Sequence, residues 1–161
     1  MPISGLSCAD IAGDDQSRDR HFGEAVIAVD RWSVLVIEND DDIRATLVEA
    51  LRDSGLVVEA AGDAGPSIDA WRGDVIVTDT FASPYHTEAV VAYLNELRSR
   101  FAAGVVVLTA HNGAAVDAAQ LPADAVVMKP FDLSDLIGVV GAVARDRHER
   151  HARNDERLLA S

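Results

Sequence analysis

The stretch SVLVIENDDDIR, residues 33–44, changes from a strand pattern to a helix pattern within one short segment. Its first half, Ser33–Glu38, is an apolar, β-branched run with the length of a buried strand. Residues 40–54 then carry apolar side chains at helical spacing, and Gly55 follows as a natural residue to end a helix. The stretch therefore predicts a buried strand followed by an amphipathic helix.

The same alternation continues along the chain. Further strands are predicted at residues 56–61, 74–79, 104–109 and 124–128. Further helices are predicted at residues 66–71, 87–97, 112–120 and 131–147, the third of these being a weak, alanine-rich one. Strands that alternate with helices form a parallel sheet that is covered on both faces, with right-handed crossovers. The predicted fold is α/β, a doubly wound five-stranded parallel sheet built from five βα units.

Composition narrows the class of protein. The chain has 161 residues, about the length of one domain, and 27 acidic against 14 basic residues give it a net charge of −13. This charge disfavours a nucleic-acid partner, because such binding needs clustered positive charge. A lone cysteine, Cys8, excludes a disulfide framework and a cysteine-rich metal site. With no long apolar run and no signal-peptide pattern at the N-terminus, we expect a cytoplasmic protein without a membrane partner.

Three segments differ in pattern. Residues 1–32 lack a sustained period and predict a flexible leader. Residues 33–143 carry the regular alternation of strands and helices and are predicted to form the domain. Residues 144–161 are highly charged, with opposite charges four residues apart, as in Arg145 and Glu149. They predict a helical extension of the last helix, or a tail, that is too short to supply a DNA-binding module with its basic face.

Polar residues stand where the predicted strands end. The first strand is followed by Glu38 and Asn39, and the third, fourth and fifth end at Asp79, Thr109 and Lys129, the only lysine of the chain. In a parallel α/β sheet, ligands bind beyond the carboxyl ends of the strands. Carboxylates gathered there suit Mg²⁺, and a carboxylate beside such an ion is a competent nucleophile towards phosphorus. A lysine and a hydroxyl nearby would neutralise the phosphoryl oxygens.

Four motifs in order carry a family resemblance: VLVIENDDDIR (34–44), DVIVTD (74–79), VVVLTA (105–110) and VVMKPF (126–131). With them, residues 33–143 resemble a response-regulator receiver domain of the single-domain, CheY-like type. The resemblance implies a flavodoxin-like, three-layer sandwich. It also implies two-component phosphorelay signalling, in which the domain takes up a phosphoryl group and acts by protein–protein interaction rather than as an enzyme.

The resemblance assigns a role to each residue at the strand ends. Asp79 would be the phosphoacceptor, Thr109 the hydroxyl that rotates towards the phosphoryl group, and Lys129 the lysine that contacts it. Mg²⁺ would be held by Glu38, Asn39, Asp79 and the backbone carbonyl of Phe81. The implied partners are a sensor histidine kinase or phosphotransfer protein and a downstream protein target. A homodimer that forms through the 104–143 face is also compatible with the resemblance.

Three departures from the family pattern change the expectations. Asn39 replaces a second carboxylate, which weakens the expected affinity for Mg²⁺. Val126 replaces the aromatic residue that reports the switch, so a smaller structural change is expected. Pro84 stands five residues after Asp79 instead of four, in a loop without glycine.

Two alternatives to a working receiver remain open. The first is a phosphorylation-independent pseudo-receiver that serves as a protein-interaction module. The second is an enzyme on a flavodoxin-like fold. A phosphatase-like enzyme would need a second aspartate two residues after Asp79, and Phe81 stands there instead.

Overall fold

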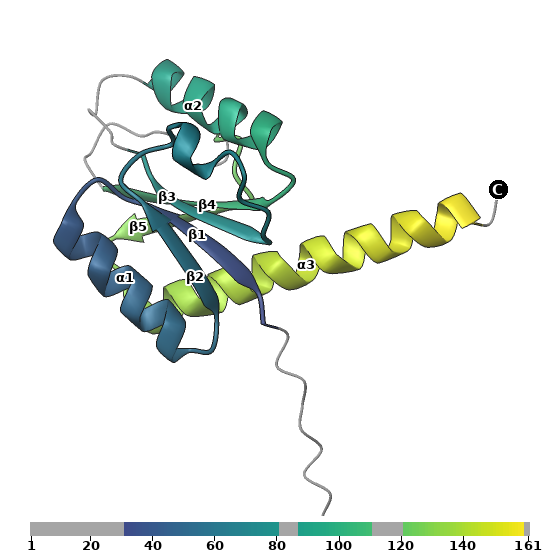
Figure 1. Ribbon diagram of the computed structural model, residues 1–161, viewed down its shortest axis with the longest axis horizontal. Helices are drawn as coiled ribbons and strands as arrows, with labels where there is room; N and C mark the ends of the chain where they lie inside the picture. Colours follow the sequence, from purple (N-terminus) through teal and green to yellow (C-terminus); the bar gives the residue numbers. More distant parts are fainter. Residues whose placement is uncertain (1–30, 81–86, 111–120, 160–161) are drawn as a thin grey trace, which may run out of the picture.

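Five strands form a single parallel sheet at the centre of the molecule (Figure 1). The computed structural model describes residues 31–80, 87–110 and 121–159. The strands are β1 (Ser33–Ile37), β2 (Val57–Ala61), β3 (Val75–Asp79), β4 (Gly104–Ala110) and β5 (Ala125–Lys129). Their spatial order is β2-β1-β3-β4-β5, and every neighbouring pair is parallel. The predicted doubly wound five-stranded sheet is confirmed, and its strand order reverses between β1 and β3, where such sheets bind ligands.

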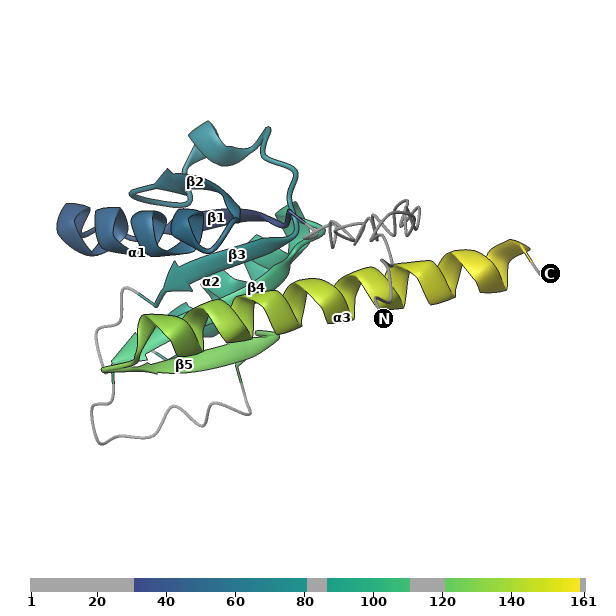
Figure 2. The same cartoon turned by 90° about the horizontal axis from the view of Figure 1, so that it is seen from below.

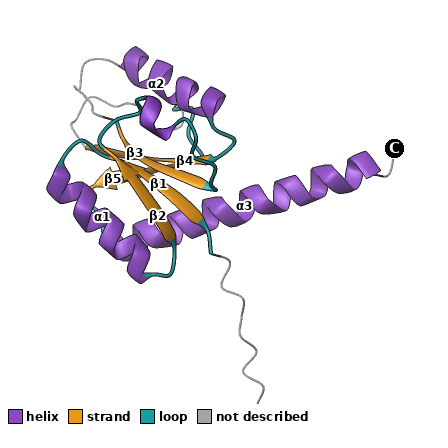
Figure 3. Cartoon of the chain, in the orientation of Figure 1, coloured by secondary structure: helices purple, strands orange, loops and turns teal. Residues whose placement is uncertain are grey.

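Helices cover both faces of this sheet, which gives three layers (Figure 3). The helices are α1 (Asp41–Asp53), α2 (Thr87–Arg100) and α3 (Leu133–Leu159), with a single 3₁₀ turn, η1 (Pro66–Ile68). Helices α1 and α3 pack on one face and α2 on the other. The described helices lack the long apolar window that a membrane-crossing segment requires.

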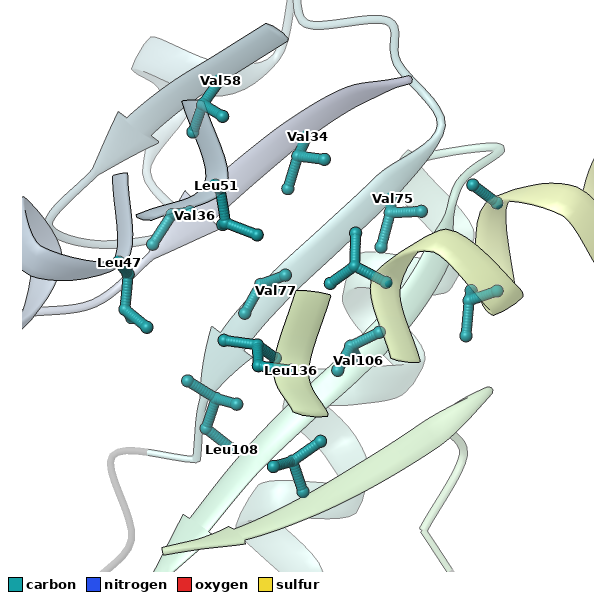
Figure 4. Packing of buried hydrophobic residues seen from close by; sticks show 14 residues of the cluster. Val34, Val36, Leu47, Leu51, Val58, Val75, Val77, Val106, Leu108 and Leu136 are labelled. Atoms are coloured by element: carbon teal, nitrogen blue, oxygen red, sulfur yellow. The ribbon is translucent and has the colours of Figure 1, made fainter. Parts of the chain in front are cut away.

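A hydrophobic cluster fills the space on each side of the sheet. Leu51 of α1 and Leu136 of α3 pack against the inward valines of β1, β3 and β4 (Figure 4). On the other face, Leu94 and Leu97 of α2 pack over Ile76 of β3. The central strands β1, β3 and β4 are buried on both faces, which explains the continuous apolar runs in their sequences.

Helix α1 begins and ends on the residues that the sequence predicts. The side chain of Asp40 caps it by accepting hydrogen bonds from the backbone N–H groups of Asp42 and Ile43, both at 3.0 Å. At the other end Gly55 has φ +93°, a left-handed conformation that glycine adopts without a steric penalty. The Asp40 cap fixes the end of the loop between β1 and α1, which carries part of the functional site.

The helix predicted at residues 66–71 is wrong, because the segment forms only the single turn η1. Before this turn, the side chain of Asp63 accepts a hydrogen bond from the backbone N–H of Gly65 at 2.7 Å. Arg100 of α2 holds the irregular segment by donating to the carbonyl oxygens of Ala64 and Gly65 at 2.7 and 3.2 Å. Trp71 then covers the sheet where a longer helix would have lain.

Helix α3 has 27 residues and extends well past the sheet (Figures 1 and 2). The sequence predicted the last helix to Arg147, followed by a helical extension or a tail, and the helix runs on without a break to Leu159. Two contacts hold its middle: the ring of His148 lies 5.7 Å from that of Trp32, and Arg150 pairs with Asp124 at 3.5 Å. Residues 151–159 are exposed.

Some expectations fall outside the described residues. These are most of the leader at 1–32, the loop with Phe81 and Pro84, and the alanine-rich helix at 112–120.

Candidate functional site

Three charged side chains meet at the carboxyl edge of the sheet, as the positions of the strand ends predict. Glu38 directly follows β1, Asp79 is the last residue of β3, and Lys129 is the last residue of β5. The Nζ atom of Lys129 lies 2.7 Å from Oδ2 of Asp79 and 3.6 Å from Oε2 of Glu38. Two carboxylates and one ammonium group leave this pocket with a net charge of −1.

The ammonium group of Lys129 is stabilised by its two neighbours. Burial by itself lowers the pKa of Lys129, and this is the largest single contribution. The hydrogen bond to Asp79, together with the charges of Asp79 and Glu38, outweighs burial, and the pKa is raised. Because the pKa of Lys129 is raised on folding, its pairing contributes its full stability at pH values below the unfolded-state pKa of about 10.4. This contribution is lost as the pH rises through the folded-state pKa. Lys129 therefore carries its positive charge throughout the neutral range.

Glu38 is the most deeply placed member of the site, with a side chain only 1% exposed. Its Oε1 atom accepts a hydrogen bond from the backbone N–H of Asp40 at 3.0 Å. Its Oε2 atom is buried and has no hydrogen-bond partner among the described residues. A buried carboxylate oxygen without a donor is costly unless a cation faces it. Oε2 is therefore positioned to take a metal ligand role in addition to its long contact with Lys129.

Arg44 fixes the loop that carries Glu38. Its Nη1 atom donates to the backbone carbonyl oxygen of Glu38 at 2.6 Å, and its Nη2 atom pairs with Asp41. The Arg44 side chain is about three-quarters buried, whereas its partner Asp41 is exposed. The first turn of α1 and the end of β1 are thereby tied together, and the position of Glu38 depends on both.

The other predicted site residues occupy different surroundings. Asn39 is exposed beside Glu38, and Thr109 is half-buried near the end of β4, opposite Met128 of β5. Of the described residues, Lys129 and Thr80 hydrogen-bond to the Asp79 carboxylate, and Thr109 does not. Val126 packs against the core on the α2 side of the sheet.

Two threonines flank Asp79, and the sequence analysis did not single them out. The hydroxyl of Thr80 lies 3.5 Å from Oδ1 of Asp79. The hydroxyl of Thr78 donates to the backbone carbonyl oxygen of Asp79 at 3.0 Å and lies 2.9 Å from the hydroxyl of Tyr93 in α2. Burial, the largest contribution, raises the pKa of Tyr93, and the bond to Thr78 lowers it in part. Tyr93 therefore remains a neutral hydrogen-bonding group.

The residues present fit a magnesium ion held by few protein ligands. Within residues 31–80, 87–110 and 121–159, no three His, Cys, Asp or Glu side chains gather in a metal-binding arrangement. Mg²⁺, however, commonly uses one or two carboxylates and keeps several waters. Glu38 and Asp79 supply two carboxylates, and Oε2 of Glu38, which has no hydrogen bond and only the 3.6 Å contact with Lys129, is an acceptor of the required kind.

Comparison with known proteins identifies the class of protein that this fold and site define. The family model "Response regulator receiver domain" matches residues 34–141, and the chain belongs to that family. It is thus the receiver domain of a two-component response regulator. Receiver domains generally bind Mg²⁺ at their phosphorylation site and interact with a histidine kinase or another phosphodonor.

Individual relatives agree with this assignment. The chain is 29% identical over 126 residues to the DNA-binding transcriptional regulator NtrC of Bradyrhizobium sp. (strain RP501 Parasponia), with 73% of this chain and 25% of the relative covered. It is 31% identical over 116 residues to NtrC of Azospirillum brasilense, with 67% and 23% covered. The chain thus spans about a quarter of the length of these relatives.

Solved structures show the same fold. A CheY-like response regulator receiver domain protein from Methanospirillum hungatei JF-1 is similar with a TM-score of 0.57 and 21% identity, covering 73% of this chain and 97% of that one. NtrX from Brucella abortus, solved in complex with ADP, gives a TM-score of 0.66 and 23% identity, covering 78% of this chain and 29% of that one.

Proposed function

We propose that Asp79 is a phosphoacceptor and that the domain signals through protein–protein interaction in a two-component pathway. The observation that carries the proposal is the 2.7 Å contact between Lys129 and Asp79, with the buried Glu38 beside it. A nucleophilic carboxylate needs an adjacent cation to accept a dianionic phosphoryl group without strong repulsion. Lys129 supplies that charge at the end of the sheet.

The geometry suits transfer from a histidine kinase, a phosphotransfer protein or a small phosphodonor. An oxygen of the Asp79 carboxylate would attack phosphorus while the bond to the donor breaks, and Lys129 would hydrogen-bond to the phosphoryl oxygens. Glu38 and Asp79, with the amide of Asn39 and the carbonyl that the family resemblance assigns to Phe81, would hold Mg²⁺, which would supply further positive charge. In this proposal the domain is a substrate of phosphoryl transfer and a signalling module rather than an enzyme.

Output through protein contact rather than DNA contact is supported by the net charge of −13. The surface formed by residues 104–143 is proposed to contact the downstream target or a second copy of the domain.

Treatment with acetyl phosphate and Mg²⁺ is expected to add one phosphoryl group to the protein, as measured by intact mass. The Asp79→Asn variant, which keeps the size of the side chain and loses its charge, is expected to show no added mass. Asp53→Asn, at the exposed end of α1, is the matched control and should be phosphorylated like the wild type. Unmodified wild-type protein, under conditions that phosphorylate a known receiver, would contradict the proposal.

A pseudo-receiver is the second candidate, and Asn39 is the observation that favours it. This residue places a neutral amide where the family has a carboxylate, so the pocket keeps two carboxylates and one ammonium group. Weaker attraction for Mg²⁺ follows from the lost charge. The absence of phosphorylation in the mass measurement would support this second function.

Replacing Asn39 by aspartate is expected to tighten Mg²⁺ binding by about tenfold, because it adds one negative charge next to Glu38 at the proposed metal site. Asn39 is exposed, so the change does not disturb the core. Calorimetric titration of both proteins measures the ratio of affinities. Equal affinities would show that residue 39 does not face the metal.

A further inference from the structure

The two oxygens of the Asp79 carboxylate have different hydrogen-bond donors. Oδ2 accepts from Nζ of Lys129 at 2.7 Å, whereas Oδ1 faces the hydroxyl of Thr80 at 3.5 Å. Because a carboxylate only accepts, the hydroxyl of Thr80 must be the donor. The contact is long for an O–H···O bond, as hydrogen bonds at a resting site often are before the reacting group is bound.

The fold holds Thr80 in this position. Its side chain is 7% exposed, and its backbone N–H donates to the carbonyl oxygen of Leu108 at 3.2 Å, which extends the pairing of β3 with β4 by one residue. Thr80 is thus a buried polar side chain at the reacting group, fixed by the sheet rather than by the loop that follows. Its hydroxyl is directed to the oxygen that Lys129 leaves unoccupied.

We infer that Thr80 is a positioning residue that shortens the lifetime of the phosphorylated state of Asp79; this rests on the proposed function. In hydrolysis, water attacks phosphorus and the bond between phosphorus and the Asp79 oxygen breaks, giving dihydrogen phosphate and the free carboxylate. A hydrogen bond to a carboxylate is stronger than one to the neutral acyl group of an acyl phosphate. The hydroxyl of Thr80 therefore stabilises the leaving carboxylate more than the phosphorylated side chain.

The hydrogen bond from Thr80 has the opposite effect on the phosphorylation of Asp79. The hydrogen bond stabilises the free carboxylate before it attacks the phosphodonor, so removing it makes the carboxylate a slightly better nucleophile. Loss of the hydroxyl should slow hydrolysis without slowing phosphorylation. A variant that merely disordered Asp79 would slow phosphorylation, and the two explanations are thereby separated.

The test compares Thr80→Val, which keeps the shape of the side chain and removes the hydroxyl, with Thr80→Ser, which keeps the hydroxyl. Each protein is phosphorylated with acetyl phosphate and Mg²⁺, desalted, and followed by intact mass with and without EDTA. We expect the half-life of the phosphorylated form to be about fivefold longer in Thr80→Val, and close to the wild-type value in Thr80→Ser. The ratio should persist in EDTA, because Thr80 acts on the carboxylate and not on the metal.

Two results would overturn the inference while leaving the proposed function intact. One is a wild type that is phosphorylated and has the same half-life as Thr80→Val. The other is a half-life in Thr80→Ser that matches that of Thr80→Val. A wild type that takes up no phosphoryl group would overturn the proposed function and the inference with it. Urea unfolding midpoints of the three proteins show whether each variant is folded.

Discussion

Replacing Lys129 by methionine is expected to slow phosphorylation of Asp79 by about a hundredfold to a thousandfold, the usual effect of removing one donor to a developing negative charge. Methionine fills a similar volume but brings no charge. The Nζ atom of Lys129 lies 2.7 Å from Asp79, on the side where phosphoryl oxygens would arrive. The measurement is the initial rate of phosphorylation by acetyl phosphate at saturating Mg²⁺.

The same substitution is expected to tighten Mg²⁺ binding, by about tenfold or more, since the net charge of the pocket falls from −1 to −2. Rate and metal affinity thus change in opposite directions, which a general loss of structure would not produce. Lys129→Arg, which keeps the charge, is the matched control and should leave metal affinity near the wild-type value. A Lys129→Met protein that is phosphorylated at the wild-type rate would remove Lys129 from the proposed chemistry.

Leu136→Ala is expected to lower the free energy of unfolding by about 2–5 kcal/mol, the usual cost of a cavity left by a buried leucine. Leu136 lies in the first turn of α3, is fully buried, and packs against the valines of the central strands (Figure 4). Leu159 closes the same helix and is 89% exposed, so Leu159→Ala should change stability by less than about 0.5 kcal/mol. Urea denaturation followed by circular dichroism measures both.

Equal effects of the two substitutions would contradict the division of α3 into a packed part and an exposed part. A large loss in Leu159→Ala alone would show that the far end of the helix is buried in solution, for example against another copy of the chain.

The sequence predicted the sheet because the pattern of each strand is local. The strands Ser33–Ile37 and Val75–Asp79 contain the apolar, mostly β-branched runs VLVI and VIV, which are typical of strands buried on both faces. At residues 66–71, Pro66 favours the first turn of a helix and that turn forms, but the helix does not continue, and Trp71 packs in the core beneath α2. Tertiary contacts decided that element.

Some residues of the site could likewise be predicted from the sequence, and others could not. Glu38, Asp79 and Lys129 were predicted because parallel strands bring their carboxyl ends to one edge. Thr80 and Arg44 could not be predicted from the sequence, because their roles depend on which atoms their side chains reach. Thr80 reaches Oδ1 of Asp79, and Arg44 reaches the backbone carbonyl oxygen of Glu38. A threonine next to a strand-ending aspartate carries no signal of its own.

The length of α3 has a mechanical consequence. At 1.5 Å per residue, its 27 residues span about 40 Å, with the buried turns at one end and Leu158 and Leu159 at the other. The first part of the helix, to Ala144, packs in the core, and the rest extends beyond it. A tilt of about 10° about its first turn would carry the far end through about 7 Å, while the residues near the pivot would move by a fraction of that distance.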